Sequence, residues 1–332
     1  MQDTGSRRLR VHIVQPPPDD ALSALENLLD PAVDLAVGPE PAPTTEILVT
    51  GRPTREHLGV CPDLQTLIVP YAGIPEETRK LLLDERPDIA VHNLHHNAAA
   101  AAELAVALLL AAAKSIIPAD RALRRGDWRT RYDGAPTLIL AGKTALLLGL
   151  GAIGSRVATA CSALGMEVHA VRRRTDRPHA SYVVVHPPDA LGQLIPCADV
   201  LLVCLPLTPE TRGLIGVQEL DLLRPSAILV NVARGAIVDE AALYHALADG
   251  RLAAAGIDVW YRYPRTSEER ANTPPSDYPF HELDNVVMSP HRGGAFRTEE
   301  LEEQRMCDLA TSLNAAVRGE SIPHLVDLAA GY

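Results

Sequence analysis

The sequence lacks the features that mark several large classes of protein. Its five cysteines are scattered, with no Cys-x-x-Cys pair, so no disulfide framework is indicated and buried free thiols in a reducing cytoplasm are expected. An excess of basic residues is also absent. The net charge of -11 argues against nucleic acid or an anionic membrane as a partner, because both attract basic surfaces.

Long apolar runs are absent as well. Residues 1–10 are polar and basic and contain no apolar signal core. The most apolar stretch, Ala98–Ala113, contains Glu103 and is shorter than the ~20 residues that a membrane span requires. We therefore expect a buried helix there, no membrane partner and a cytoplasmic protein.

What the sequence does contain is an alternation of short apolar runs with helical patterns. With 332 residues, the chain is long enough for two domains with separate cores. The runs are nearly continuous in apolar residues, which is typical of strands in a parallel sheet covered on both faces. The predicted strands of a first series are residues 11–14, 33–37, 47–49, 67–69 and 89–91. Those of a second series are residues 145–148, 167–171, 182–185, 200–204, 228–232, 255–259 and 286–288.

This alternation predicts an α/β protein with two doubly wound parallel-sheet domains. The helical pattern at 297–318 follows the second sheet, and we expect it to cross back and pack on the first domain. Residues 1–97 together with 294–332 then form a flavodoxin-like substrate domain, and residues 98–293 form a Rossmann nucleotide-binding domain. The active site is expected in the cleft between them, beside an irregular, proline-rich surface loop at 262–279.

The glycine motif Gly149-x-Gly151-x-x-Gly154 follows the predicted strand 145–148 and leads into an alanine-rich helical pattern. This order of strand, glycine turn and helix is what a dinucleotide pyrophosphate needs. Gly149 permits the tight turn, Gly151 lets the backbone approach the phosphates, and Gly154 lets the helix pack on its strand. The helix N-terminus, including Ala152 and Ile153, offers N–H groups to the anion.

Several ordered motifs make the whole chain resemble the D-isomer-specific 2-hydroxyacid dehydrogenases, a family that includes phosphoglycerate dehydrogenase, glyoxylate/hydroxypyruvate reductase and formate dehydrogenase. Besides the glycine motif, they are Val69-Pro-Tyr-Ala-Gly-Ile74, Leu205-Pro-Leu-Thr-Pro-Glu-Thr-Arg-Gly-Leu214, Asn231-Val-Ala-Arg-Gly-Ala-Ile-Val-Asp239, Gly256-Ile-Asp-Val259 and Ser289-Pro-His-Arg-Gly-Gly294. The resemblance implies transfer of a hydride between a nicotinamide nucleotide and a small anionic substrate. It also implies a homodimer formed through Ala98–Ala113.

The resemblance assigns roles to individual residues. Arg234 matches the substrate-holding arginine, and a guanidinium fork suits a carboxylate or a carbonyl. His291 matches the acid/base histidine, whose imidazole titrates near neutrality. Asp258 matches the aspartate that contacts the nicotinamide amide. The positions matching the cofactor lining are Leu205, Pro206, Ala233 and Gly293, and those matching the substrate side are Tyr71, Ala72, Gly73 and Asn97.

One departure from the family concerns the cofactor. A Rossmann unit for NAD usually ends its second strand in an acidic residue that binds the ribose hydroxyls. Here the strand 167–171 runs into Arg172-Arg-Arg174. Cations at this position favour the 2′-phosphate of NADP, so we predict NADP over NAD, with Arg172 and Arg173 as contacts.

A second departure concerns catalysis. The family's histidine usually pairs with a glutamate five residues after the aspartate, but Tyr263 occupies that position here, with Tyr261 the candidate if the register slips. A neutral phenol does not stabilise imidazolium as a carboxylate does, so a lowered histidine pKa is expected. Tyr263 could still orient the ring through a hydrogen bond.

Three functions are compatible with these features. The first is an NADP-dependent oxidoreductase for a small 2-keto or 2-hydroxy acid, with Arg234, His291 and Tyr263 at the catalytic centre. The missing glutamate leaves open hydride abstraction from an unusual small anion such as formate. A nucleotide-sensing scaffold, like the C-terminal binding protein of this family, is the third. The histidines His92, His95 and His96 are interpreted as structural or as substrate contacts, since no carboxylate or cysteine completes a metal site.

Overall fold

The computed structural model describes residues 8–134, 136–294 and 298–331. The chain divides into two compact units, the first formed by Met1–Asn97 with Ala295–Tyr332 and the second by Ala98–Gly294. Each unit contains one fully parallel sheet with helices on both faces, as expected from the apolar runs.

The first unit is built on a five-stranded sheet in the order β2-β1-β3-β4-β5. Its strands are β1 (Leu9–Ile13), β2 (Val33–Val37), β3 (Ile47–Val49), β4 (Thr66–Val69) and β5 (Ala90–Asn93). Its helices are α1 (Asp19–Leu28), α2 (Arg55–Val60), α3 (Glu76–Glu85) and α11 (Glu299–Val317). The order reverses at β1, which pairs with β2 on one side and β3 on the other.

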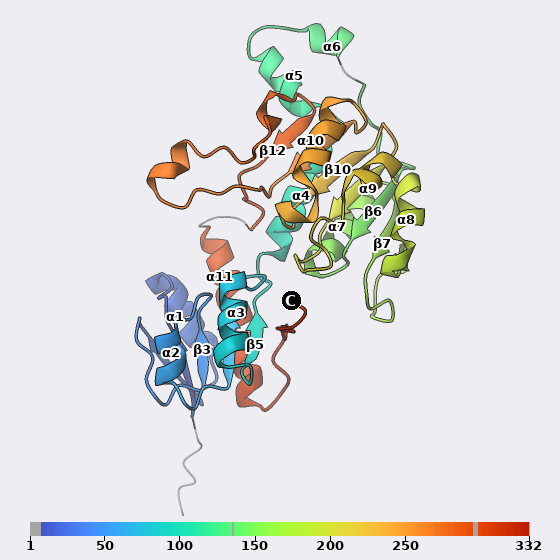
Figure 1. Ribbon diagram of the computed structural model, residues 1–332. Helices are drawn as coiled ribbons and strands as arrows, with labels where there is room; N and C mark the ends of the chain where they lie inside the picture. Colours follow the sequence, from blue (N-terminus) through green and yellow to red (C-terminus); the bar gives the residue numbers. More distant parts are fainter. Residues whose placement is uncertain (1–7, 135, 295–297, 332) are drawn as a thin grey trace, which may run out of the picture. The chain divides into compact units, whose positions relative to one another are not determined.

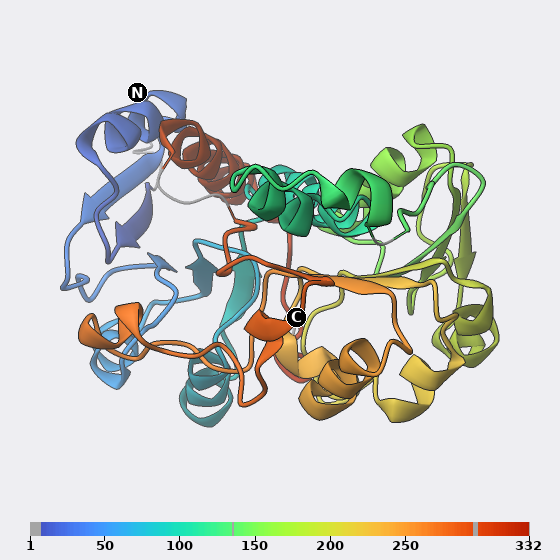
Figure 2. The same cartoon turned by 90° about the horizontal axis from the view of Figure 1, so that it is seen from above.

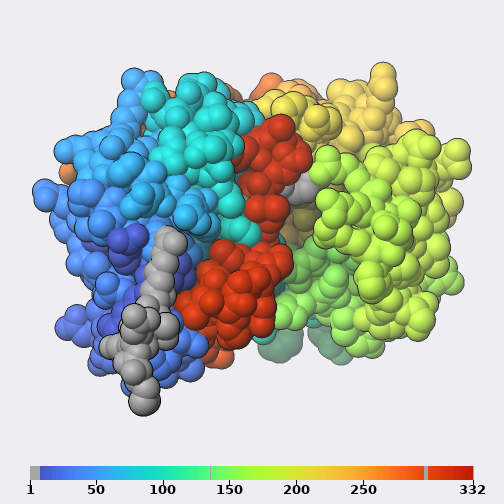
Figure 3. Space-filling model, turned by 90° about the horizontal axis from the view of Figure 1, so that it is seen from below, coloured from blue at the N-terminus to red at the C-terminus, as the bar shows by residue number. Residues whose placement is uncertain are grey.

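Alternate residues of these strands supply two separate cores. Val11, Ile47 and Ile68 face a cluster that includes Leu25 of α1 and Leu309 of α11. The opposite face, with Leu48 and Leu67, packs against α2 and α3. The helix α11 therefore returns to the first unit, as predicted, and Figure 3 shows this C-terminal segment in red against the blue N-terminal part. The predicted first residue of this helix, Arg297, lies outside the described residues.

The second unit carries a seven-stranded sheet in the order β12-β11-β10-β9-β6-β7-β8. Its strands are β6 (Thr144–Leu148), β7 (Glu167–Val171), β8 (Val183–His186), β9 (Val200–Val203), β10 (Ile228–Asn231), β11 (Ala254–Ile257) and β12 (Val286–Met288). Its helices are α4 (Ala98–Ala113), α5 (Ile116–Leu123), α6 (Arg129–Asp133), α7 (Ala152–Ala163), α8 (Leu191–Leu194), α9 (Val217–Leu222) and α10 (Glu240–Ala248).

The helices of this unit form a layer on each face of the sheet (Figure 2). α4 and α7 cover one face and pack on Leu147 and Leu202, whereas α9 and α10 cover the other and pack on Leu148 and Leu201. Every second strand residue faces the same layer. The order reverses between β6 and β9, so this edge is the switch point where doubly wound sheets bind ligands.

The structure corrects the sequence-based expectations in two details. Several strand ends move by up to two residues; the first strand, predicted at 11–14, runs from Leu9 to Ile13. The thiols are all free, but Cys197 and Cys307 are exposed rather than buried, because Cys197 ends a short 3₁₀ turn and Cys307 lies on the solvent side of α11. The loop at 262–279 is irregular apart from a single 3₁₀ turn, Glu268–Ala271.

The apolar helix α4 is packed within its own unit. Eight of its sixteen residues are buried, and it lies against α7 and the sheet. Among the described residues, no single helix meets the length and apolarity of a membrane span, and α4 with α5 meets them together only as a pair bent by 66°.

Candidate active site

The glycine turn after β6 has the geometry that a dinucleotide phosphate requires. Gly149 has φ +96°, and a Cβ there would lie 2.9 Å from the Cys204 carbonyl oxygen. A Cβ on Gly154 would lie 2.2 Å from the Gly149 carbonyl oxygen, so only glycine lets α7 start this close to the strand. By contrast, nothing lies within 4 Å of a Cβ built on Gly151. This open space stands before the first N–H groups of α7, at Ala152 and Ile153, and the residues present therefore fit a bound pyrophosphate.

The end of β7 presents arginine where a ribose-binding carboxylate would stand. The Arg172 guanidinium donates from Nη2 to the Arg177 carbonyl and lies 3.4 Å from His179 Nδ1, while its Nε is buried without a hydrogen-bond partner among the described residues. The Thr208 side chain and, more weakly, the charge of Arg173 lower the pKa of Glu210, which places Arg173 beside the loop that follows β9. That loop includes Leu205 and Pro206, and the Pro206 carbonyl accepts a 2.7 Å hydrogen bond from Thr211 Oγ1.

Arg234 stands in the turn that follows β10. The turn is held by Asn231, which is 1% exposed. The Asn231 side chain accepts from the Ala233 backbone N–H at 3.0 Å and donates to the Arg234 carbonyl at 3.0 Å. The Arg234 guanidinium donates from Nη1 to the Ala233 carbonyl at 2.7 Å. The remaining donors of this solvent-accessible fork can take an anion.

His291 stands in the turn that follows β12, with φ 59° in the left-handed region. This conformation costs a non-glycine residue about 1–2 kcal/mol and needs support from its surroundings. The support comes from Asp258, which is fully buried at the end of β11. Its carboxylate accepts from Ser289 Oγ at 2.5 Å and from the backbone N–H groups of Arg292 at 2.7 Å and Gly293 at 2.8 Å. Asp258 and Gly293 therefore fix the His291 turn; their predicted contacts with the cofactor stay predictions.

Of the two candidate tyrosines, Tyr263 is the one whose ring lies against His291. The two ring centroids are 5.5 Å apart and the planes are inclined by 57°. The Tyr263 hydroxyl accepts a 3.0 Å hydrogen bond from the Trp260 backbone N–H. Tyr261 points elsewhere and donates to the Val238 carbonyl at 3.0 Å. The contact between Tyr263 and His291 is thus between rings, and the hydroxyl closes the tyrosine's own turn.

Arg234, Tyr263 and His291 form one electrostatic cluster. Burial lowers the pKa of His291; the charge of Arg234 lowers it further and Asp258 acts in the opposite direction. The protein atoms around the guanidinium also lower the pKa of Arg234 by desolvation, although the side chain still reaches solvent, and Tyr263 opposes this effect. Burial raises the pKa of Tyr263, so its phenol is neutral beside the histidine. The pKa of His291 is therefore lower than that of an ordinary histidine.

The residues predicted on the substrate side lie in the first unit. The loop Tyr71, Ala72 and Gly73 follows β4, and Gly73 has φ +81°. The Asn97 side-chain oxygen is buried and has no hydrogen-bond partner among the described residues. Both features suit a contact with a ligand, which stays a prediction.

The histidines near Asn97 are held neutral. Burial lowers the pKa of His95 to about 4, and burial followed by the charge of Arg305 lowers the pKa of His96 to about 4. His95 stacks on His324 with ring centroids 4.1 Å apart, and His92 Nδ1 lies 2.8 Å from the Pro323 carbonyl oxygen. In the described part of the chain, no group of three or more potential ligands could hold a metal ion.

Sequence reasoning missed the residues that hold the turns of Arg234 and His291. Asn231 and Ser289 were within quoted motifs, but their hydrogen bonds were not foreseen. A buried polar residue at the end of a parallel strand was the available signal, because such a group needs partners. Arg52 and Arg305, which line a pocket of the first unit, lie outside the motifs of the sequence.

Comparisons with known proteins agree with this arrangement. A family model for the NAD binding domain of D-isomer specific 2-hydroxyacid dehydrogenases matches residues 106–293. The D-3-phosphoglycerate dehydrogenase of Methanocaldococcus jannaschii is 32% identical over 96% of this chain and 60% of its own length. The glyoxylate reductase of Thermococcus litoralis is 35% identical over 84% of this chain and 82% of its own length.

The fold also matches solved structures. A D-isomer specific 2-hydroxyacid dehydrogenase from Xanthobacter autotrophicus Py2, solved with NADPH and MES, superposes with a TM-score of 0.79 at 26% identity, covering 98% of this chain and 100% of that one. The chain spans about half to three fifths of the length of the curated phosphoglycerate dehydrogenases that it matches.

Proposed function

Because the chain belongs to the D-isomer specific 2-hydroxyacid dehydrogenase family, we propose that it transfers a hydride between NADP and a small 2-keto or 2-hydroxy acid. The observation that carries the proposal is the cluster of Arg234, His291 and Tyr263 at the carboxyl ends of β10, β11 and β12, in the same unit as the glycine turn. When bound, the nicotinamide nucleotide supplies the hydride for reduction of the keto acid.

The roles of the side chains follow from their chemistry. The Arg234 fork holds the substrate's carboxylate or carbonyl oxygen through charge-assisted hydrogen bonds. The His291 imidazolium donates its proton to the developing alkoxide, and the neutral imidazole accepts that proton in the reverse direction. The Tyr71–Gly73 loop offers backbone N–H groups to the carboxylate. Tyr263 keeps the histidine ring in place by packing.

The preference for NADP rests on Arg172 and Arg173. The Arg172 guanidinium stands at the end of β7, and it has five N–H donors, of which the Arg177 carbonyl accepts from Nη2. No carboxylate stands among residues 172–174, where NAD-binding units carry one. The Xanthobacter relative binds NADPH, which supports the same choice here.

The test measures, by absorbance, the rate at which NADPH and NADH are oxidised in the presence of a keto acid. The acceptors are glyoxylate, hydroxypyruvate and pyruvate, each from acid to alkaline pH. We expect turnover with NADPH that declines as pH rises through the lowered pKa of His291, because reduction needs the imidazolium. His291→Ala should lower kcat by about 10²- to 10⁴-fold. Tight nucleotide binding without turnover of any keto acid would instead favour the formate-like reaction or the nucleotide-sensing scaffold.

The cofactor preference is tested with Arg172→Ser and Arg173→Ser together. The double variant should lose about 10- to 100-fold in kcat/KM for NADPH and little for NADH, because a charge-assisted contact to the 2′-phosphate is removed. Arg174→Ser is the matched control, and an equal loss in that variant would contradict the assignment.

A homodimer in the cytoplasm completes the proposal. The five free cysteines fit a reducing compartment. The segment formed by α5, α6 and the residues after them projects from the sheet of the second unit (Figure 1) and exposes large apolar side chains. These are Ile116, Leu123, Trp128, Tyr132 and Ile139, with exposed fractions of 50% to 75%. Exposed apolar clusters of this kind mark protein interfaces. Trp128→Asp should shift the molecular mass in solution from dimer to monomer, measured by light scattering.

A further inference from the structure

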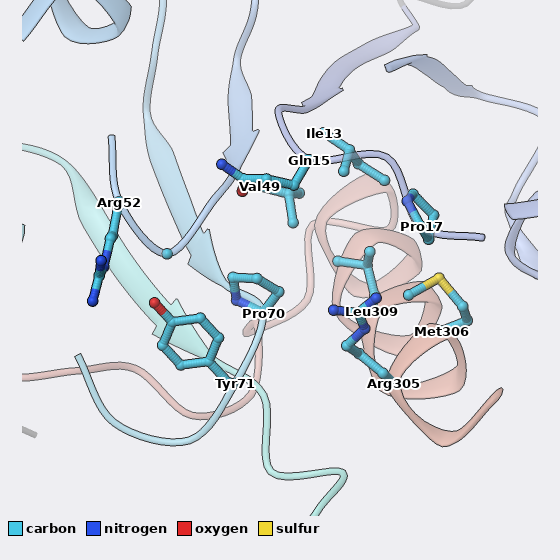
Figure 4. A pocket seen from close by; sticks show the side chains of 11 residues that line it. Ile13, Gln15, Pro17, Val49, Arg52, Pro70, Tyr71, Arg305, Met306 and Leu309 are labelled. Atoms are coloured by element: carbon cyan, nitrogen blue, oxygen red, sulfur yellow. The ribbon is translucent and has the colours of Figure 1, made fainter. Parts of the chain in front are cut away.

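The first unit contains a pocket of about 320 Å³ at the carboxyl ends of β1, β3 and β4 (Figure 4). One wall is the helix α11, which contributes Arg305, Met306 and Leu309. The strand order reverses between β1 and β3, so the pocket lies at the switch point of this sheet. Ligands of doubly wound sheets bind at such points, because the loops on either side diverge there.

The pocket continues from the loop that is proposed to hold the substrate carboxylate. Tyr71 is the first residue of that loop and also lines the pocket. A Cβ on Gly51 would lie 1.9 Å from the Tyr71 hydroxyl oxygen, so the glycine is what admits the phenol here. A substrate whose carboxylate sits on the Tyr71–Gly73 backbone therefore has this pocket beside it, within the same unit.

The polar groups of the pocket are donors. Arg52 and Arg305 stand on opposite sides of the pocket in Figure 4, and the Tyr71 hydroxyl points toward Arg52, whose side chain hydrogen-bonds to it. Burial raises the pKa of Tyr71, against the opposing charge of Arg52, so the phenol keeps its proton. The Gln15 side-chain oxygen already accepts from Thr50 Oγ1 at 3.1 Å, which leaves its amide N–H groups to face a ligand. None of the described lining residues is a carboxylate.

Arg305 is the group that most needs an acceptor. Its side chain is 24% exposed, and one terminal nitrogen pairs with Glu302 on the previous turn of α11. Its Nε is buried and has no hydrogen-bond partner among the described residues. Arg305 lines the pocket, so its guanidinium can give a charge-assisted hydrogen bond to an anion there.

The rest of the lining is apolar. Ile13 and Val49 from the strand ends face Met306 and Leu309 from α11 across the pocket. Such walls accommodate a short hydrocarbon stem, whereas the two guanidinium groups accommodate an oxyanion.

We propose that the pocket receives the substrate's side chain and that this side chain ends in a second acidic group, a carboxylate or a phosphate. The proposal rests on the proposed function, since the first carboxylate and the keto group are those handled by the reaction. It names the substrate class as 2-keto acids with two anionic ends. Arg305 and Arg52 are then specificity-determining residues.

The experiment compares kcat/KM with NADPH for matched acceptors. 2-Oxoglutarate is paired with 2-oxovalerate, and phosphohydroxypyruvate with hydroxypyruvate, so that the two arms distinguish a carboxylate from a phosphate. We expect the doubly anionic member of at least one pair to be preferred by about tenfold or more. Arg305→Gln and, separately, Arg52→Gln should each remove most of that preference, a fall of about tenfold.

Glu302→Gln is the matched control, because it removes the same ion pair on α11 and keeps Arg305. It should leave the preference unchanged or increase it. A preference that is absent, or that persists in both arginine variants, overturns the proposal while the proposed function stands.

A binding measurement distinguishes a failure of the proposed function from a failure of the proposed substrate class. Glutarate, which has no keto group, should raise the melting temperature of the wild-type protein, whereas pentanoate should not, and Arg305→Gln should abolish the glutarate effect. If no keto acid is turned over and this pattern is still found, the proposed function fails and the anionic pocket is upheld. If glutarate and pentanoate act alike and no keto acid is turned over, both proposals are wrong.

Discussion

Two turns of the second unit carry the proposed catalytic groups, and they are held in different ways. The turn after β10 presents Arg234 and is held locally by the neutral amide of Asn231. The turn after β12 presents His291 and is held from the neighbouring strand by the carboxylate of Asp258. The two supports are connected, because the Asp258 backbone N–H donates to the Asn231 carbonyl at 3.0 Å.

The two kinds of support, a neutral amide and a carboxylate, match the different requirements of Arg234 and His291. Arg234 is charged at every working pH and has an extended backbone with φ -146°, so a neutral local support is sufficient. His291 must change its charge and sits in the left-handed region. The carboxylate of Asp258 restrains this backbone and also opposes the lowering of the His291 pKa by burial and by Arg234. A single buried aspartate thus fixes the position of the histidine and moderates the lowering of its pKa.

The largest expected effect comes from removing the two supports. Asp258→Ala leaves three donors of the His291 turn without an acceptor, which should cost about 3 kcal/mol or more in the free energy of unfolding. A histidine displaced by about 1 Å should lose about 10²-fold in kcat. Denaturant unfolding and steady-state kinetics measure the two losses.

Asn231→Ala is the comparison variant. It removes two neutral hydrogen bonds, so we expect a loss of about 1–3 kcal/mol in unfolding free energy and a pH profile with an unchanged midpoint. Equal losses in the two variants, with equal pH profiles, would show that the charge of Asp258 has no separate role.

Adding a second carboxylate beside His291 also tests whether a nearby negative charge raises the histidine pKa, and we expect an effect of intermediate size. Tyr263→Glu places a carboxylate beside His291, which should raise the pKa of the imidazole by about one unit. The decline of the reduction rate should then move to higher pH by the same amount. Tyr263→Gln is the neutral control. A pH profile that is the same in both variants would mean that His291 is not the titrating group.

The smallest effect is expected from Tyr263→Phe. The hydroxyl accepts only the Trp260 backbone N–H in the described structure, and the ring contact with His291 is retained. We expect a loss of about 1 kcal/mol in unfolding free energy and no shift of the pH midpoint. A large fall in kcat would instead assign the hydroxyl a direct part in proton transfer.

The sequence was sufficient for the architecture. Every strand that the apolar runs predict is present, since parallel strands buried on both faces leave a continuous apolar signature. The return of α11 to the first unit followed from its place after the last strand. The glycine turn was also predictable, because the positive φ of Gly149 and the contact of Gly154 with the Gly149 carbonyl are local requirements of the turn.

The hydrogen bonds that hold the His291 turn and the pocket of the first unit were not predictable from local sequence patterns. Asp258 meets Ser289 and Gly293 only because β11 and β12 are neighbours in register, which no local pattern encodes. Arg305 reaches the strand ends of the first unit only because α11 packs on their sheet. Contacts between residues tens or hundreds of positions apart depend on the assembled fold, whereas the strand and turn signals are local.

The return of α11 has a consequence for how the protein is made. The core of the first unit contains Leu25 and Leu309, which are separated by the whole of the second unit. During synthesis, the second unit is complete once residue 294 has left the ribosome, while one face of the sheet β1–β5 is still covered by α1 and not yet by α11. The unit that begins first is thus finished last. Until α11 packs on it, the apolar face with Val11, Ile47 and Ile68 is the surface on which a chaperone would act.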